Sequence, residues 1–345
     1  MTLPRKSRRI PFRKATFTLA VFALLLCLAE AALRSWAPIR LTGIQRAYVY
    51  DDELGIRLDE DLHSFRLSDH LEEIRTNAIG TVNFQPSFEA YDSRVFALGD
   101  SYTQGTGLPP DAAYPFQLDL QLNVGADGLY QPRYAVVNLG LAAYGAEQSL
   151  IVLRRYAERL GAPQVCLYLG SENDYADDLL FRSGYRHRHI VRGSPYWSWM
   201  TEPLLWAAEF EIGKRLKIAA SHWRRGSILP SDTGAGAKSN APRPSVAELS
   251  WPAIQKIRGA CDEYGARLIL GWTPGDSPSY TWLRSRAAKE GIAFADWWPA
   301  VESVRQYAPG ISLGNPHSGG HWRSWVNRLI ADAFAQEIER APDPI

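Results

Sequence analysis

Fold and function depend on one stretch, Arg94-Val-Phe-Ala-Leu-Gly-Asp-Ser-Tyr-Thr-Gln-Gly105, in which an apolar run stops at Gly99-Asp-Ser. An apolar run bounded by glycine is typical of a buried strand, and the polar residues after it are typical of the strand's exit loop. In open α/β sheets, reactive groups gather beyond the carboxyl ends of the strands, so Ser101 stands where a nucleophile would lie. The competing interpretation is an unreactive strand-to-helix turn, because Gly, Asp and Ser all favour turns.

Downstream of Ser101 the chain alternates between helical and strand patterns. Apolar residues recur at helical spacing in the segments 114–123, 146–160, 246–264, 280–289 and 323–340. Short apolar runs predict further strands at 134–139, 164–169, 267–272 and 292–295. With the strand that begins at Arg94, about five strands are separated by helices. This alternation predicts a three-layer α/β domain whose parallel sheet is covered on both faces.

The amino terminus combines local positive charge with an apolar run. Residues 1–14 contain Arg5, Lys6, Arg8, Arg9, Arg13 and Lys14, and the apolar segment 15–33 has 19 residues, close to the ~20 that a bilayer requires. We therefore expect a basic cytoplasmic tail, a single transmembrane helix in the inner membrane, and a domain on the extracytoplasmic side. The alternative is a signal peptide cleaved at Ala29-Glu-Ala31, which would release a secreted protein.

The exported part divides by composition. Residues 45–93 are turn-rich and read as a small β-containing lead-in, followed by the main domain at 94–345. Residues 175–245 interrupt the alternation of strands and helices as an insertion rich in aromatic and basic side chains. These side chains could pack as a helical insertion, form a platform for sugar rings, or orient the domain toward the membrane surface. Its aromatic residues include Tyr185, Tyr196, Trp197, Trp199, Trp206 and Trp223.

Three further motifs follow strands or precede the last helix. They are Val136-Val-Asn-Leu-Gly-Leu-Ala-Ala-Tyr-Gly145, Gly170-Ser-Glu-Asn-Asp174 and Asn315-Pro-His-Ser-Gly-Gly-His-Trp322. With Gly-Asp-Ser, their order resembles the SGNH (GDSL-type) hydrolase superfamily over about residues 90–340. The lead-in at Asp51-Asp-Glu-Leu-Gly55 resembles membrane-anchored members of bacterial envelopes. The resemblance implies a flavodoxin-like sheet and serine esterase or lipase activity.

The resemblance also implies a role for each motif. Ser101 would be the nucleophile and His321 its base, because a serine hydroxyl needs a neighbouring imidazole to take its proton. His317 is the alternative base. The oxyanion would be met by the Ser101 backbone N–H, the Asn173 amide and a loop N–H. The alignment assigns that N–H to Ala143, provided that its φ is not forced positive, with Gly140 as the alternative.

The chain departs from the family at one point. The family usually carries an Asp two or three residues before the catalytic His, whereas this chain has Ser318 and Gly319 there. Because that Asp orients the imidazole and stabilises its charged form, its absence predicts a slow enzyme. Asp296 is the nearest preceding carboxylate, and we do not assign it to the site.

These features favour an esterase that removes O-acyl groups, such as acetyl, from an envelope polysaccharide or another ester substrate. The alternatives are a polysaccharide O-acyltransferase and a non-catalytic carbohydrate-binding protein. We expect no cofactor, no metal and no nucleic acid: the net charge is only +1, the sequence lacks a glycine-rich phosphate loop, and its three cysteines are not spaced as zinc ligands.

Overall fold

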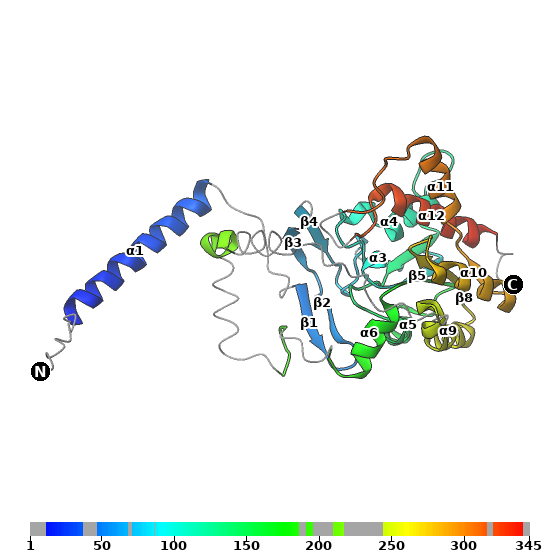
Figure 1. The fold of residues 1–345 in the computed structure, drawn as a ribbon, viewed down its shortest axis with the longest axis horizontal. Helices are drawn as coiled ribbons and strands as arrows, with labels where there is room; N and C mark the ends of the chain where they lie inside the picture. Colours follow the sequence, from blue (N-terminus) through cyan, green and yellow to red (C-terminus); the bar gives the residue numbers. More distant parts are fainter. Residues whose placement is uncertain are drawn as a thin grey trace, which may run out of the picture. The chain divides into compact units, whose positions relative to one another are not determined.

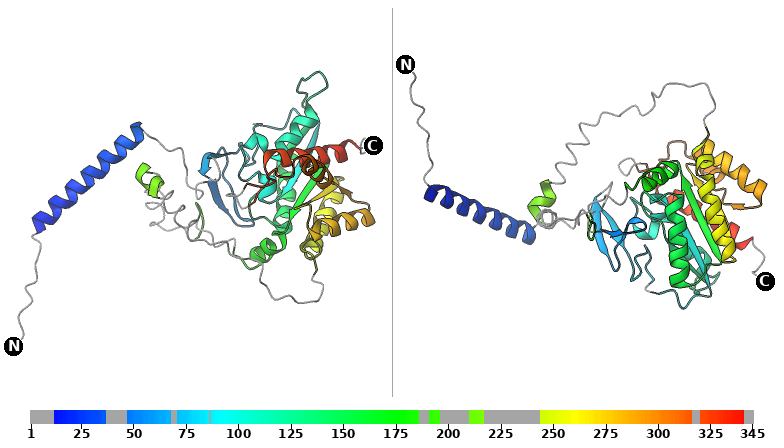
Figure 2. Two further views of the ribbon diagram at one scale, coloured as in Figure 1. Left: turned by 45° about the horizontal axis from the view of Figure 1, so that its top comes forward. Right: turned by 90° about the horizontal axis from the view of Figure 1, so that it is seen from below.

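The structure, a computed structural model, describes residues 12–36, 47–67, 71–85, 87–185, 191–195, 210–216, 244–315 and 320–340 (Figures 1 and 2). The chain forms two compact units. One comprises Met1–Gly43 and Ser198–Lys238, and the other comprises Ile44–Trp197 and Ser239–Ile345. The larger unit holds the sheet, the lead-in and all four motifs.

A five-stranded parallel sheet forms the centre of the larger unit, as the sequence predicts. Its order is β6-β5-β7-β8-β9, which in chain order reads 2-1-3-4-5, the flavodoxin-like arrangement. Every residue of the central β7 is buried, because helices cover both faces of the sheet. The strands are β5 (Ser93–Gly99), β6 (Tyr134–Asn138), β7 (Val165–Ser171), β8 (Arg267–Thr273) and β9 (Ala293–Phe294).

Helices form the two outer layers (Figure 1). α4 (Tyr114–Asn123) and α12 (Ser324–Glu339) pack together on one face, and α5 (Ala146–Leu160), α9 (Val246–Glu263) and α10 (Pro278–Glu290) cover the other. The bounds of α4 and α5 are those predicted from apolar spacing. Side-chain caps fix other helix starts: the Ser245 hydroxyl accepts the Glu248 N–H at the start of α9.

Two of the longer described helices were not predicted from the sequence. α6 (Asp174–Arg182) occupies the beginning of the segment predicted as an insertion, and α11 (Trp298–Tyr307) follows β9. The buried side chains of α6 are Asp174, Asp177 and Asp178, so its inner face carries no apolar stripe to recognise. Tyr196, Trp197, Trp199, Trp206 and Trp223, the aromatic side chains proposed as a sugar platform, lie outside the described residues.

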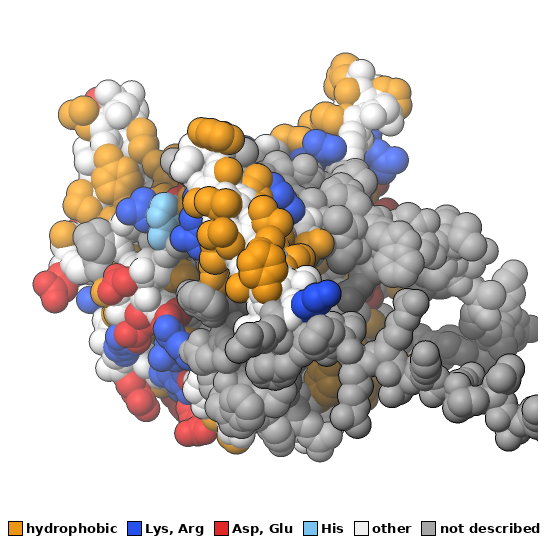
Figure 3. Space-filling model, turned by 90° about the vertical axis from the view of Figure 1, so that its left-hand side faces the viewer, with side chains coloured by type: hydrophobic (Ala, Val, Ile, Leu, Met, Phe, Trp, Pro, Cys, Tyr) orange, Lys and Arg blue, Asp and Glu red, His pale blue; other side chains and the backbone are white. Residues whose placement is uncertain are grey.

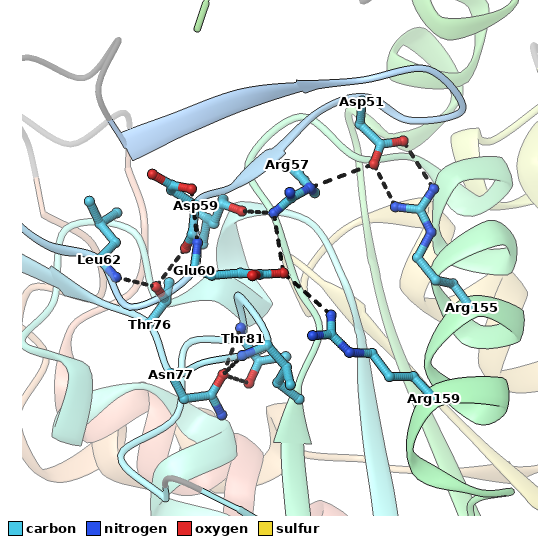
Figure 4. A network of polar contacts seen from close by, with 12 residues as sticks. Asp51, Arg57, Asp59, Glu60, Leu62, Thr76, Asn77, Thr81, Arg155 and Arg159 are labelled. Atoms are coloured by element: carbon cyan, nitrogen blue, oxygen red, sulfur yellow. Dashed lines mark hydrogen bonds and ion pairs between the residues drawn. The ribbon is translucent and has the colours of Figure 1, made fainter. Parts of the chain in front are cut away.

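The lead-in consists of two antiparallel hairpins. They are formed by β1 (Tyr48–Asp51) with β2 (Gly55–Leu58) and by β3 (His63–Leu67) with β4 (Leu71–Arg75). Figure 4 shows how polar contacts join the first hairpin to α5. Arg155 of α5 binds both carboxylate oxygens of Asp51, at 2.6 and 3.0 Å. The lead-in is therefore fastened to the helix that follows the second motif.

Helix α1 (Phe12–Trp36) belongs to the smaller unit and extends beyond both ends of the predicted span 15–33. Its segment Thr16–Trp36 has 21 residues and a mean hydropathy of 2.2, which makes it long and apolar enough to cross a membrane. Its large hydrophobic side chains are exposed, and Figure 3 shows them on the face of α1 in view.

Candidate active site

Ser101 lies at the carboxyl edge of the sheet because β5 ends in a sharp turn. Gly99 has φ +145°, and a Cβ there would lie 2.4 Å from Thr103 Oγ1 and 2.6 Å from the Leu169 carbonyl oxygen, so only glycine fits. Asp100 then caps the short helix α3 (Ser101–Gln104), its Oδ1 accepting the Tyr102 N–H at 2.9 Å. This edge lies at the switch point between β5 and β7, where ligands bind in such sheets.

His321 meets Ser101 across 220 residues of sequence, with His321 Nε2 and Ser101 Oγ 2.7 Å apart. This distance agrees with the expectation that the first and last motifs meet. The Asn315 N–H donates to the His321 carbonyl oxygen at 2.8 Å and fixes the backbone before α12. The Tyr102 ring lies against the imidazole, with 4.8 Å between ring centroids. The Ser–His contact is thus held by elements from both ends of the domain.

The alternative base, His317, and the two positions where the family usually carries an Asp belong to one short segment before His321. His317, Ser318 and Gly319 lie outside the described residues, so the alternative base stays a prediction. Asp296 is engaged away from His321: it accepts the Tyr280 hydroxyl at 2.7 Å and pairs with Arg284 at 3.2 Å.

The second motif presents one unbonded backbone N–H. In the loop Gly140–Tyr144, the N–H groups of Leu141, Ala142 and Tyr144 bond to Gly99 O, Gln104 Oε1 and Leu141 O. The Gly140 N–H is taken by Asn138 Oδ1 at 3.1 Å, which argues against Gly140 as the alternative donor. Among the described residues, the Ala143 N–H and the Ser101 N–H have no acceptor. Neither N–H is committed to another acceptor within the described chain, as an oxyanion donor requires.

Ala143 adopts φ +69°, so the condition attached to its role at the sequence level is not met. A left-handed conformation costs an L-residue roughly 1–2 kcal/mol, and glycine would avoid this cost. The strain is real, yet the N–H is retained, because the direction of the N–H depends on the backbone and not on the Cβ. The loop therefore keeps an alanine in a glycine conformation.

Asn173 is tied to neighbouring carboxylates. Its Nδ2 donates to Asp177 Oδ2 at 2.6 Å, and its Oδ1 accepts the Ser171 hydroxyl at 2.6 Å. These contacts hold the amide between β7 and α6, and its role as a third oxyanion donor stays a prediction.

Sequence reasoning missed a buried acidic cluster below the nucleophile. Asp100 and Asp174 are both buried and share the Ser171 hydroxyl, at 2.8 and 2.9 Å. Burial raises the pKa of both carboxyls, and the negative charge of Asp100 raises the pKa of Asp174 further, well above its usual range. Hydrogen bonds from Tyr102 and Ser171 oppose the shift at Asp100. Both shifts favour a protonated carboxyl in the pair, and the charge of Asp100 adds to the effect of burial at Asp174.

The described cysteine, histidine and carboxylate side chains are the groups that could ligate a metal ion. Among them, no group of three His, Cys, Asp or Glu side chains is arranged to hold an ion. Cys166 and Cys261 are buried free thiols, and Cys27 is exposed on α1.

No protein-family model and no curated protein matches this sequence. Similar solved structures include a lipolytic protein of the G-D-S-L family from Veillonella parvula, 11% identical, covering 72% of this chain and 99% of that one with a TM-score of 0.40. TesA is 14% identical, covering 71% and 98%, with a TM-score of 0.40. A GDSL-like lipase from Bacteroides thetaiotaomicron is 13% identical, covering 73% and 90%, with a TM-score of 0.36. The chain is similar to these GDSL-type proteins, the group that its four motifs resemble.

Proposed function

We propose that the protein is a serine esterase that works through an acyl-Ser101 intermediate. The observation that supports this is the 2.7 Å contact between Ser101 Oγ and His321 Nε2, next to the unbonded N–H of Ser101 itself. A nucleophile, its base and an oxyanion donor are the minimal set for acyl transfer.

The proposed reaction has two steps, acylation of Ser101 and hydrolysis of the acyl-enzyme. In the tautomer that leaves Nε2 unprotonated, His321 takes the Ser101 proton while Oγ attacks the ester carbonyl carbon. The oxyanion receives the N–H groups of Ser101 and Ala143, the C–O bond to the alcohol breaks, and His321 returns the proton to the leaving oxygen. Water then repeats the sequence on the acyl-enzyme, releasing the acid and restoring Ser101.

The proposed substrate is an O-acetylated carbohydrate of the cell envelope. Support for it comes from the sequence: the insertion carries aromatic and basic side chains suited to sugar rings, and the apolar helix α1 would keep the domain near the envelope. An acyltransferase would use the same first step and pass the acyl group to a sugar hydroxyl.

The test uses the full-length protein and an activated acetyl ester. Ser101→Ala and His321→Ala should each lower kcat by about 10³-fold or more, and the double variant should be little worse, because the two residues act as one unit. Ser303→Ala, an exposed serine on α11, is the control. Mass spectrometry should find the acetyl group on Ser101 during turnover. Undiminished activity of Ser101→Ala would overturn the proposal, and acetyl transfer to an added oligosaccharide would identify a transferase.

We also propose that α1 is retained as an anchor. Glu30 of α1 is buried and accepts the N–H groups of Glu211 at 2.8 Å and Ile212 at 3.1 Å, while Arg34 donates to it at 2.7 Å. The guanidinium of Arg34 also lies 5.4 Å from the Phe210 ring centre. Cleavage at Ala29-Glu-Ala31 would remove the carboxylate that caps residues 211–216, which supports an uncleaved helix.

A further inference from the structure

The loop that carries Ala143 is held from outside the sheet domain. The Tyr144 side chain is 3% exposed, and its hydroxyl donates to the Ile56 carbonyl oxygen of β2 at 2.6 Å. Gln148, in the first turn of α5, donates through Nε2 to the Leu54 carbonyl oxygen at 2.8 Å. The β1–β2 hairpin therefore supplies two buried acceptors to the residues that follow Ala143.

The strain at Ala143 needs such support. A residue held in a sparsely populated backbone region persists only where its surroundings over-determine it. On the amino side, the Ala142 N–H is fixed by Gln104 Oε1 at 2.8 Å. On the carboxyl side, Tyr144 is fixed twice, by its N–H to Leu141 O at 3.0 Å and by its hydroxyl to Ile56 O. Ala143 lies between these restraints with its own N–H unbonded among the described residues.

We propose that Tyr144 is a positioning residue, through which the β1–β2 hairpin holds the Ala143 N–H in place as an oxyanion donor. This inference rests on the proposed esterase function. It gives the lead-in an indirect part in the reaction. The hairpin does not contact the substrate, but its Ile56 carbonyl oxygen binds Tyr144, the residue next to the proposed oxyanion donor. Burial raises the pKa of Tyr144 well above its usual value, so the phenol remains a donor at neutral and mildly alkaline pH.

The test variant is Tyr144→Phe in the full-length protein. It keeps the ring and removes one hydrogen bond, so Ala143 can relax out of the left-handed region and turn its N–H away. Complete loss of an oxyanion donor costs about 10²–10³ in rate, and for a displaced donor we expect kcat to fall about tenfold. KM should change little, because the donor acts mainly in the transition state.

Tyr156→Phe is the matched control. The Tyr156 hydroxyl donates to the Ile79 carbonyl oxygen at 2.8 Å, so it also joins α5 to the lead-in, but it lies thirteen residues beyond Ala143. Loss of either tyrosine hydroxyl leaves a lead-in carbonyl without its donor, so both variants should unfold at lower urea concentration. Only Tyr144→Phe should lose kcat.

A rescue variant separates positioning from general damage. Glycine accepts positive φ without strain, so Ala143→Gly should make the loop less dependent on the hairpin. The loss of kcat caused by Tyr144→Phe should therefore be smaller in the Ala143→Gly background, which also provides a more stable host if Tyr144→Phe alone folds poorly. Equal kcat for Tyr144→Phe and Tyr156→Phe, or an undiminished loss in the glycine background, would overturn the positioning role. Full activity in Ser101→Ala would overturn the esterase proposal as well as this inference, whereas failure of the hairpin test leaves the esterase proposal standing.

Discussion

Ser171 illustrates at the scale of one residue how the buried acids must share protons. Its single hydroxyl proton faces three acceptors: Asn173 Oδ1 at 2.6 Å, Asp100 Oδ2 at 2.8 Å and Asp174 Oδ1 at 2.9 Å. One donor cannot satisfy three acceptors at once, so a second proton in the cluster would complete its hydrogen bonds. A protonated Asp174 would supply it, which is the direction in which burial and the charge of Asp100 shift its pKa. The Tyr168 hydroxyl donates to the other oxygen of Asp174.

This arrangement predicts a particular dependence of stability on pH. An unfolded Asp releases its proton near pH 3.8, whereas burial and the charge of Asp100 raise the pKa of folded Asp174, so above pH 3.8 the folded state binds more protons. The free energy of unfolding should therefore fall as pH rises toward the folded pKa. Asp174→Asn supplies the same donor and acceptor without a titrating group, so its stability relative to wild type should improve between pH 5 and pH 8. Urea denaturation at both pH values measures this, with the exposed Asp127→Asn as control. A relative stability of Asp174→Asn that is the same at both values would contradict a protonated Asp174.

Residue identity and order in the sequence predicted the Ser101–His321 contact but not the details around it. Ser101 and His321 follow from motif order, because strand ends in a parallel sheet share one edge. The positive φ of Ala143 could not be predicted, because a left-handed alanine is imposed by tertiary contacts such as Gln104 and Ile56. The sequence also did not predict that Asp100 and Asp174 share the Ser171 hydroxyl. These two residues are 74 positions apart and belong to different motifs.

At the scale of elements, the predictions that succeeded were those with strong patterns. α4 and α5 were predicted to the residue because apolar side chains recur at helical spacing up to a clear stop: Gly161 ends α5 with φ +87°. α6 was missed because its buried side is acidic, and α11 because its buried face has only Trp298 and Val301. Tertiary context stabilises both helices.

The ion pair between Asp51 of β1 and Arg155 of α5 joins the lead-in to the sheet domain. Burial raises the pKa of Asp51, but the hydrogen bonds from Arg155 and from the backbone N–H groups of Leu54 and Glu53, together with the Arg155 charge, outweigh burial and keep that pKa below its usual 3.8. Asp51→Asn should lower the free energy of unfolding by about 1–2 kcal/mol at pH 7, since Arg155 is partly exposed and the pair is partly screened. A group with a depressed folded pKa stabilises above the unfolded pKa, so the difference between Asp51→Asn and wild type should shrink as pH falls below about 4.

A matched ion pair lies one residue away on the same helix. Arg154 and Glu263 are 3.7 Å apart with side chains 52% and 64% exposed, and Glu263→Gln should cost less than about 0.5 kcal/mol. The urea concentrations at the unfolding midpoints of Asp51→Asn and Glu263→Gln, each compared with wild type, measure the two costs. If Asp51→Asn costs no more than Glu263→Gln, the bidentate contact is not what fastens the lead-in to α5.

At the scale of the whole molecule, charge asymmetry about α1 sets the expected orientation. Arg5, Lys6, Arg8 and Arg9 precede the apolar segment, and basic residues near a short amino terminus keep that end in the cytoplasm. The domain that follows would then lie outside the cytoplasm. This compartment suits an enzyme that acts on envelope carbohydrate.

The last prediction combines orientation with retention of the helix. Alkaline phosphatase fused after Ile345 should be active, because it folds only outside the cytoplasm, and the protein should stay in the membrane fraction after alkaline extraction with an intact mass that includes residues 1–31. Replacing Arg5, Lys6, Arg8 and Arg9 by Gln should weaken the orientation and lower the activity of the fusion. A soluble product that begins after Ala31 would show that α1 is a cleaved signal, and then residues 211–216 would lose Glu30 as their cap. An inactive fusion on a membrane-bound chain would instead show the reverse orientation and would place the Ser101 site in the cytoplasm.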